Sequence, residues 1–299
     1  MSEYLGAPGG GFSPVRLPPA GRRPAIPSLQ IRLAASQQMS CQALVQASTL
    51  ARLADLAYGK KRVLPYGYID ITHDSHALAK LNLTPALLNV SDDHFRARVF
   101  SSVQGFITHY VVAFAGTDPT NAEDDEADIE QAFGYDTSQY RDASSIGYKL
   151  HLIPSTIPIV LTGHSLGGGL ATEAAFYSGR PAVIFNSAGL HRNNIPKGVK
   201  PPSVDAYSVD GDPLTFLQTR MRLVLSWAAF SYLPAVSWPS YLIFGDPLGG
   251  AIPPAYGRSI TVPDRKVARQ GVLGAMMDRH SIGRVERDLD QLRIVLQCR

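Results

Sequence analysis

The sequence predicts an α/β fold in which a central, mostly parallel sheet is flanked by helices. Short apolar runs that suit buried strands alternate with segments long enough for helices, as expected for β-α-β units. The chain has 299 residues, enough for one core that buries about 75% of the unfolded surface. With 45% hydrophobic and 18% charged residues, the composition excludes a fibrous or disordered protein.

The chain divides into an N-terminal arm, residues 1–35, and one large domain, residues 36–299. Gly and Pro are so frequent in the arm that neither a helix nor a packed strand is expected there. The arm also lacks the apolar run of a secretory signal, so we expect a protein that is cytoplasmic or exported by a dedicated secretion system. The domain begins with residues 40–58, whose apolar positions form one helical stripe that ends before Gly59.

The middle of the chain carries the expected strands. Residues 95–115 are rich in β-branched and aromatic residues and are interrupted at 102–105, which predicts a hairpin. The second strand of that hairpin, residues 110–115, is apolar on both faces and is expected in the middle of a covered sheet. Further strands are expected at residues 155–161, 182–185, 204–209 and 259–262, and a last helix at residues 282–296.

A candidate nucleophile follows one of these strands. Gly163, Ser165 and Gly167 form a Gly-x-Ser-x-Gly motif between the strand and a run of small residues that suits a helix. This context is what a nucleophile elbow requires, because the sharp turn pushes the serine above the sheet and its neighbours must be small. Ser165 is therefore the candidate nucleophile, and an ordinary Gly-rich turn is the rival interpretation.

The serine needs a general base, and in this arrangement an acid and then a histidine follow it along the chain. Only His191 and His280 lie downstream of Ser165, and His191 comes too early to leave an acid between them at a strand end. His280 is therefore the expected base. Two carboxylates, Asp210 and Asp212, follow the strand before it; Asp212 is preferred because a proline fixes its loop, and Asp210 stays open.

The negative charge on a tetrahedral intermediate requires hydrogen-bond donors. One is expected from the backbone N–H of Leu166, the residue after the nucleophile. The other is expected from Thr117, which follows a central strand and Gly116 and carries a hydroxyl as well as its N–H. A plain turn after the strand is the alternative for this segment.

These motifs resemble those of the class 3 lipases, an α/β-hydrolase group that includes the triacylglycerol lipases of filamentous fungi and many bacterial lipase-like proteins. The resemblance covers the chain from about Ser40 onward and rests on VVAFAGTD (111–118), LTGHSLGGGLA (161–171), FNSAGL (185–190), the Gly-Asp-Pro-Leu loop (211–214) and His280. It implies an α/β-hydrolase fold with a triad of Ser165, Asp212 and His280 and an oxyanion hole of Thr117 and Leu166. The chain departs from the family at Ala115, where arginine is common.

Two further segments bear on the substrate. Residues 223–245 contain no charge and include six aromatic residues, but Pro234 and Pro239 break any membrane-spanning helix. We expect a cap insertion at residues 216–256 whose aromatic residues suit a lipid interface, with extra core as the alternative. Residues 123–130 contain six acids and are interpreted as solvated surface, with a mobile acidic lid or a calcium site left open.

Charge and cysteine content limit the partners. The net charge is only +3 and no basic stripe is present, which argues against nucleic acid as a partner. Cys41 and Cys298 have no His or Cys at ligand spacing, so neither a zinc site nor a disulfide framework is indicated, and a single bridge stays open. No cofactor or metal is expected.

The leading functional hypothesis is a serine hydrolase that cleaves carboxylic esters of lipids, a phospholipase A or lipase that works through an acyl-enzyme. Its expected partners are a lipid, preferably a phospholipid, and a membrane surface. An exported antibacterial effector is a further hypothesis, and such a toxin needs an immunity protein in its producer. A non-catalytic lipid- or protein-binding module and an acyltransferase are the alternatives.

Overall fold

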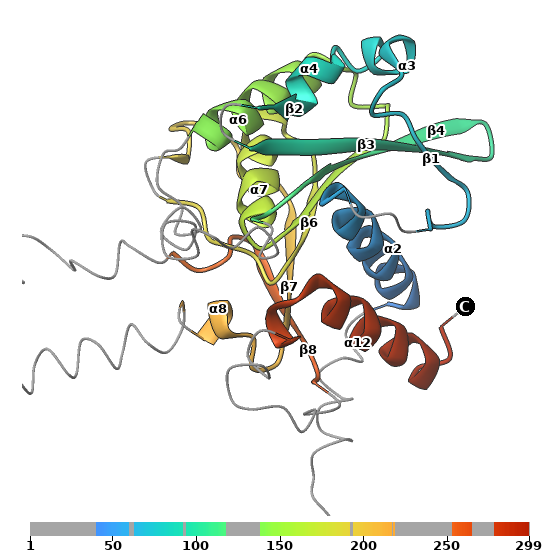
Figure 1. Cartoon of the computed structure of the whole chain (residues 1–299), viewed down its shortest axis with the longest axis vertical. Helices are drawn as coiled ribbons and strands as arrows, with labels where there is room; N and C mark the ends of the chain where they lie inside the picture. Colours follow the sequence, from blue (N-terminus) through green and yellow to red (C-terminus); the bar gives the residue numbers. More distant parts are fainter. Residues whose placement is uncertain are drawn as a thin grey trace, which may run out of the picture. The chain divides into compact units, whose positions relative to one another are not determined.

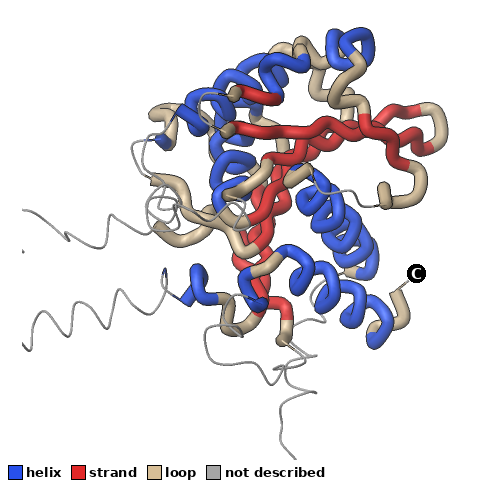
Figure 2. Tube along the Cα trace, in the orientation of Figure 1, coloured by secondary structure: helices blue, strands red, loops and turns tan. Residues whose placement is uncertain are grey.

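The computed structural model describes residues 40–59, 63–91, 94–117, 138–191, 194–216, 218, 253–264 and 278–298. The expected arm, the acidic segment 123–130 and nearly all of the expected cap lie outside these ranges. Within them the chain forms an eight-stranded mixed sheet with helices on both faces (Figures 1 and 2), which confirms the predicted α/β fold. No helix in the described part of the chain is long and apolar enough to cross a membrane.

The sheet has the strand order β1-β3-β4-β5-β6-β7-β8, and β2 pairs with β3 beside this path. The strands are β1 (Tyr68–Asp70), β2 (Asn89–Val90), β3 (Phe95–Gln104), β4 (Ile107–Phe114), β5 (Ile159–His164), β6 (Ala182–Phe185), β7 (Val204–Val209) and β8 (Arg258–Val262). Strands β4 to β8 run parallel to one another, whereas β1, β3 and β4 form antiparallel pairs. The carboxyl ends of the parallel strands therefore meet at one edge of the sheet, where sites of α/β proteins form.

Two apolar clusters lie on opposite faces of this sheet. The helices are α2 (Cys41–Ala57), α3 (Ser75–Ala79), α4 (Pro85–Leu88), α6 (Ser138–His151), α7 (Leu166–Ser178), α8 (Pro213–Phe216) and α12 (Ile282–Val295). Successive residues of β4 alternate between the clusters: Val112 and Phe114 pack with α6 and α7, and Val111 and Ala113 pack with α2 and α12. The last four residues of β4 are buried, as expected for a strand in the middle of the sheet.

Some strand and turn boundaries differ from those that the sequence predicts. The predicted bounds of β6 and β7 match the structure, whereas β5 begins at Ile159 instead of residue 155. The preceding residues form turns around the buried Arg180, whose guanidinium donates to the carbonyls of Ile153, Pro154 and Ile157. The hairpin turn lies at residues 105–106, later than the predicted 102–105. These differences concern turns, which the apolar patterns do not define.

A disulfide joins Cys41, the first residue of α2, to Cys298 beyond α12, with the Cα atoms 5.1 Å apart. The bridge that the sequence left open is therefore present. The two helices lie side by side on one face of the sheet (Figure 1). Asp290 of α12 also accepts hydrogen bonds from Arg52 and Ser48 of α2, at 2.5 Å each, so the bridge reinforces an existing helix pair.

Candidate active site

The turn between β5 and α7 holds Ser165 in a strained conformation. Its φ of 57° and ψ of −127° lie in a region that residues other than glycine rarely adopt. A Cβ atom at Gly163 would lie 2.1 Å from the carbonyl oxygen of Gly167, and one at Gly167 would lie 2.2 Å from that of Phe114. Both motif positions therefore have to be glycine for the strand and helix to approach this closely.

Ser165, His280 and Asp212 form one chain of hydrogen bonds. Nε2 of His280 lies 2.9 Å from Oγ of Ser165, and Nδ1 lies 2.8 Å from Oδ1 of Asp212. Because a carboxylate only accepts, Nδ1 carries the proton and donates it to Asp212, which leaves Nε2 to accept from the serine hydroxyl. The structure thus brings together all three residues that the sequence singled out. This geometry allows the imidazole to remove the serine proton.

The two candidate acids differ in burial. Asp210 is exposed, whereas the side chain of Asp212 is fully buried and accepts a 2.7 Å hydrogen bond from the N–H of Thr215. Burial alone raises the pKa of Asp212, but the hydrogen bond and charge of His280, together with Thr215, bring this pKa below its ordinary value. Asp212 is therefore a carboxylate at neutral pH, and it is the acid whose contact with the imidazole is seen.

The expected oxyanion donors lie beside the elbow. Leu166 is the first residue of α7, so its N–H has no acceptor within the helix. The N-terminus of a helix also favours negative charge, which suits a donor to an oxyanion. A Cβ at Gly116 would lie 2.7 Å from the carbonyl oxygen of His164, so the segment that leads to the half-buried Thr117 presses against the elbow. Ala115, the departure from the lipase pattern, is 5% exposed and packs in the core on the α2 face.

Sequence reasoning missed a second histidine that contacts the candidate base. Nε2 of His164 lies 2.6 Å from the carbonyl oxygen of His280, and the hydroxyl of Tyr58 lies 2.8 Å from Nδ1 of His164. The carbonyl only accepts, so Nε2 carries the proton and Tyr58 donates to Nδ1. Burial, and then the charge of His280, lowers the pKa of His164 to about 3, so this ring is neutral at neutral pH. His164 lies inside the elbow motif, which is the available sequence clue.

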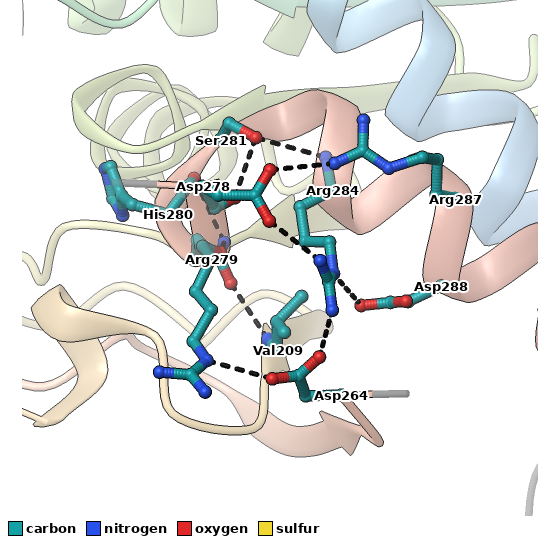
Figure 3. Close-up of polar contacts among 10 residues, drawn as sticks. Val209, Asp264, Asp278, Arg279, His280, Ser281, Arg284, Arg287 and Asp288 are labelled. Atoms are coloured by element: carbon teal, nitrogen blue, oxygen red, sulfur yellow. Dashed lines mark hydrogen bonds and ion pairs between the residues drawn. The ribbon is translucent and has the colours of Figure 1, made fainter. Parts of the chain in front are cut away.

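An ion cluster, also missed, fixes the helical turn 278–280 that carries His280 (Figure 3). Among the described residues its members are Arg279, Arg284 and Arg287 with Asp264, Asp278 and Asp288. Arg284 is 6% exposed and binds all three aspartates, so its buried charge is compensated. Through Asp264 and Asp278 the cluster connects the segment after β8, the helical turn 278–280 and α12.

Comparison with known proteins relates this chain to phospholipases. Residues 49–268 match the family model described as a phospholipase-like, Tle-like phospholipase domain. This range includes Ser165 and Asp212, and His280 follows it. The chain is also 34% identical over 158 residues to an extracellular phospholipase A1 of Serratia liquefaciens, an alignment that covers 50% of this chain and 47% of that protein. The chain therefore spans about half the length of this curated relative.

Proposed function

Since the chain belongs to the Tle-like phospholipase family, we propose that it hydrolyses a carboxylic ester bond of a phospholipid with Ser165, His280 and Asp212 as the triad. The observation that carries this proposal is the hydrogen-bond chain from the strained serine through the imidazole to the buried carboxylate. The similarity to a phospholipase A1 supports an A-type phospholipase. The motifs shared with class 3 lipases support the same chemistry and a relationship to that branch.

The geometry supports a two-step mechanism. Oγ of Ser165 attacks the ester carbonyl carbon while Nε2 of His280 accepts the hydroxyl proton, and the ionised Asp212 stabilises the imidazolium. The N–H groups of Leu166 and Thr117 stabilise the negative oxygen of the tetrahedral intermediate. Collapse of the intermediate expels the lysophospholipid alcohol, which receives the proton from His280, and leaves an acyl-serine.

Water then releases the acyl group. His280 accepts a proton from the attacking water, the second tetrahedral intermediate forms on the same carbon, and its collapse frees the fatty acid. The proton returns from Nε2 to Oγ of Ser165, so the enzyme is regenerated. The ester bond and one water molecule are consumed, and a lysophospholipid and a fatty acid are the products.

Two observations support export. The Serratia relative is extracellular, and the Cys41–Cys298 bridge suits an oxidising compartment, because cytosolic reductants keep most thiols free. Within this proposal the enzyme acts on the membrane of a competing bacterium as an effector, and its producer needs an immunity protein. Expression of the wild-type chain and the Ser165→Ala variant in a bacterial periplasm tests this role. It predicts growth arrest and lysophospholipid release with the wild type alone, and normal growth with both contradicts it.

A phospholipid panel tests the activity itself. The wild type is expected to release fatty acid and lysophospholipid, and Ser165→Ala is expected to lose about 10⁶-fold in kcat because the triad acts as a unit. Ser75→Ala, which changes an exposed serine at the start of α3, serves as the matched control and is expected to keep full activity. Turnover by Ser165→Ala at the wild-type rate would contradict the proposal.

A further inference from the structure

Asn186 directly follows β6, is fully buried and takes no part in the triad. It belongs to the Phe-Asn-Ser-Ala-Gly-Leu motif that follows this strand. Its φ of 39° lies in the left-handed region, which asparagine adopts more readily than most other residues. A buried amide in a strained position calls for contacts that keep it there.

Within the described residues the amide makes three hydrogen bonds. Its Nδ2 donates to the carbonyl oxygens of Arg279 and His280, at 3.0 and 3.1 Å. Its Oδ1 accepts from the N–H of Val209, at 2.9 Å. Val209 is the last residue of β7, directly before the loop that carries Asp212. The side chain of Asn186 therefore connects the strand that leads to Asp212 with the helical turn that carries His280.

Asn186 contacts the main chain of His280, so the imidazole ring can bind Ser165 and Asp212. The carbonyl of His280 also accepts from Nε2 of His164, so donors at the ends of β5 and β6 hold the same oxygen. The ring must stay within reach of Ser165 and Asp212, at 2.9 and 2.8 Å, and a backbone displacement would lengthen both contacts. The ion cluster holds the side chains of Asp278 and Arg279 in this helical turn (Figure 3), whereas Asn186 holds the carbonyls of Arg279 and His280.

We propose that Asn186 is a positioning residue that fixes His280 relative to Asp212 by joining Val209 to the carbonyls of Arg279 and His280. The inference rests on the proposed function. Asn186→Ala removes all three hydrogen bonds. Asn186→Asp keeps the size of the side chain and the acceptor for Val209, but it replaces the donor with a carboxylate that faces two carbonyl oxygens. Both variants are expected to lose activity. Because Asn186→Asp keeps the side-chain volume, its loss reports the missing hydrogen-bond donor and not a change in packing.

The test measures kcat and KM with p-nitrophenyl butyrate, a soluble ester. Each Asn186 variant is expected to lower kcat about 100-fold, the typical effect of a small displacement of a reacting group, and to leave KM unchanged. The decisive measurement repeats Asn186→Ala on the His280→Ala background. There the residual rate is expected to stay constant, because no imidazole is left to position.

Thr162→Val is the matched control. Thr162 is fully buried and its hydroxyl donates to the carbonyl of Val183, so this variant also removes a buried hydrogen bond between β5 and β6. It is expected to keep kcat. Circular dichroism of each variant verifies folding, and Asn186→Asp carries the test if Asn186→Ala does not fold.

Two results overturn the inference: a kcat of folded Asn186→Asp or Asn186→Ala equal to that of the wild type, or an equal loss on the wild-type and His280→Ala backgrounds. Failure of the proposed function is distinguishable, because the wild type would then show no Ser165-dependent hydrolysis. An active wild type that is indifferent to Asn186 refutes only the positioning role.

Discussion

The disulfide is expected to stabilise the fold without taking part in catalysis. Cys298→Ser removes the bridge and leaves the packing of α2 against α12 in place. The cysteines are separated by 257 residues, and the chain-entropy relation for a loop of this length gives about 5.5 kcal/mol of unfolding free energy. This is an upper bound, because measured disulfides typically contribute about 2–4 kcal/mol. At about 2 °C per kcal/mol for a domain of this size, the melting temperature should fall by about 4–8 °C.

Activity at 25 °C should not change. Cys41 and Tyr58 lie at opposite ends of the 17-residue helix α2, about 25 Å at 1.5 Å per residue. Cys298 and His280 likewise lie beyond opposite ends of α12. The bridge is therefore about one helix length from the residues around the imidazole, and its loss should act on global stability.

Calorimetry of the oxidised protein, the protein reduced with dithiothreitol and Cys298→Ser measures this effect. The reduced protein and the variant should melt at one common, lower temperature and hydrolyse ester at the rate of the oxidised protein at 25 °C. Equal melting temperatures for the oxidised and reduced proteins would show that the bridge does not stabilise the fold. Alkylation of both cysteines by iodoacetamide in the unfolded, unreduced protein would show that the bridge is absent.

Three further predictions concern charged and titratable groups. Asp212→Asn should lower kcat about 10⁴-fold with little change in KM, because the amide no longer holds the imidazole tautomer; steady-state kinetics checks this. Burial holds the pKa of His164 at about 3 in the folded chain against about 6.5 unfolded, so only the unfolded chain gains this proton as pH falls from 6.5 toward 3. The free energy of unfolding should therefore fall in that window by up to about 1.4 kcal/mol per pH unit. Urea unfolding at several pH values measures this fall, which should be smaller for His164→Gln than for the wild type. An equal dependence of stability on pH in the two proteins contradicts this. Arg284→Ala should cost about 3–5 kcal/mol in urea unfolding because it leaves Asp264, Asp278 and Asp288 close together without their central cation. Asp288→Asn in the same chain should restore part of this loss, and the absence of any restoration would argue against the cluster.

The features that the sequence predicts correctly are those defined by residues close together in the chain. The elbow was predictable because Gly163, Ser165 and Gly167 are close in sequence and their small size is a steric requirement of the turn. The bounds of β6 and β7 follow from compact apolar runs. The proline after Asp212 favours this residue over Asp210 in the sequence, but both follow the same strand, and their difference in burial appears only in the folded chain.

The contacts around the imidazole were not predictable in this way. Tyr58 and His164 are 106 residues apart, and Asn186 and His280 are 94 apart. Asn186 and His164 also bind a main-chain carbonyl, and every residue carries such a group, so no pattern of side chains marks the partner. The disulfide is a similar case, because the two cysteines meet only when the helices at the two ends of the domain pack together.

If Ser165 is a nucleophile activated by His280, a fluorophosphonate probe should react with its Oγ. Mass spectrometry of peptides from the treated protein measures this reaction. We expect an adduct on the peptide that contains Ser165, loss of phospholipid hydrolysis in step with labelling, and much slower labelling in His280→Ala. An unmodified Ser165 in a preparation that has lost its phospholipase activity to the probe would contradict this expectation.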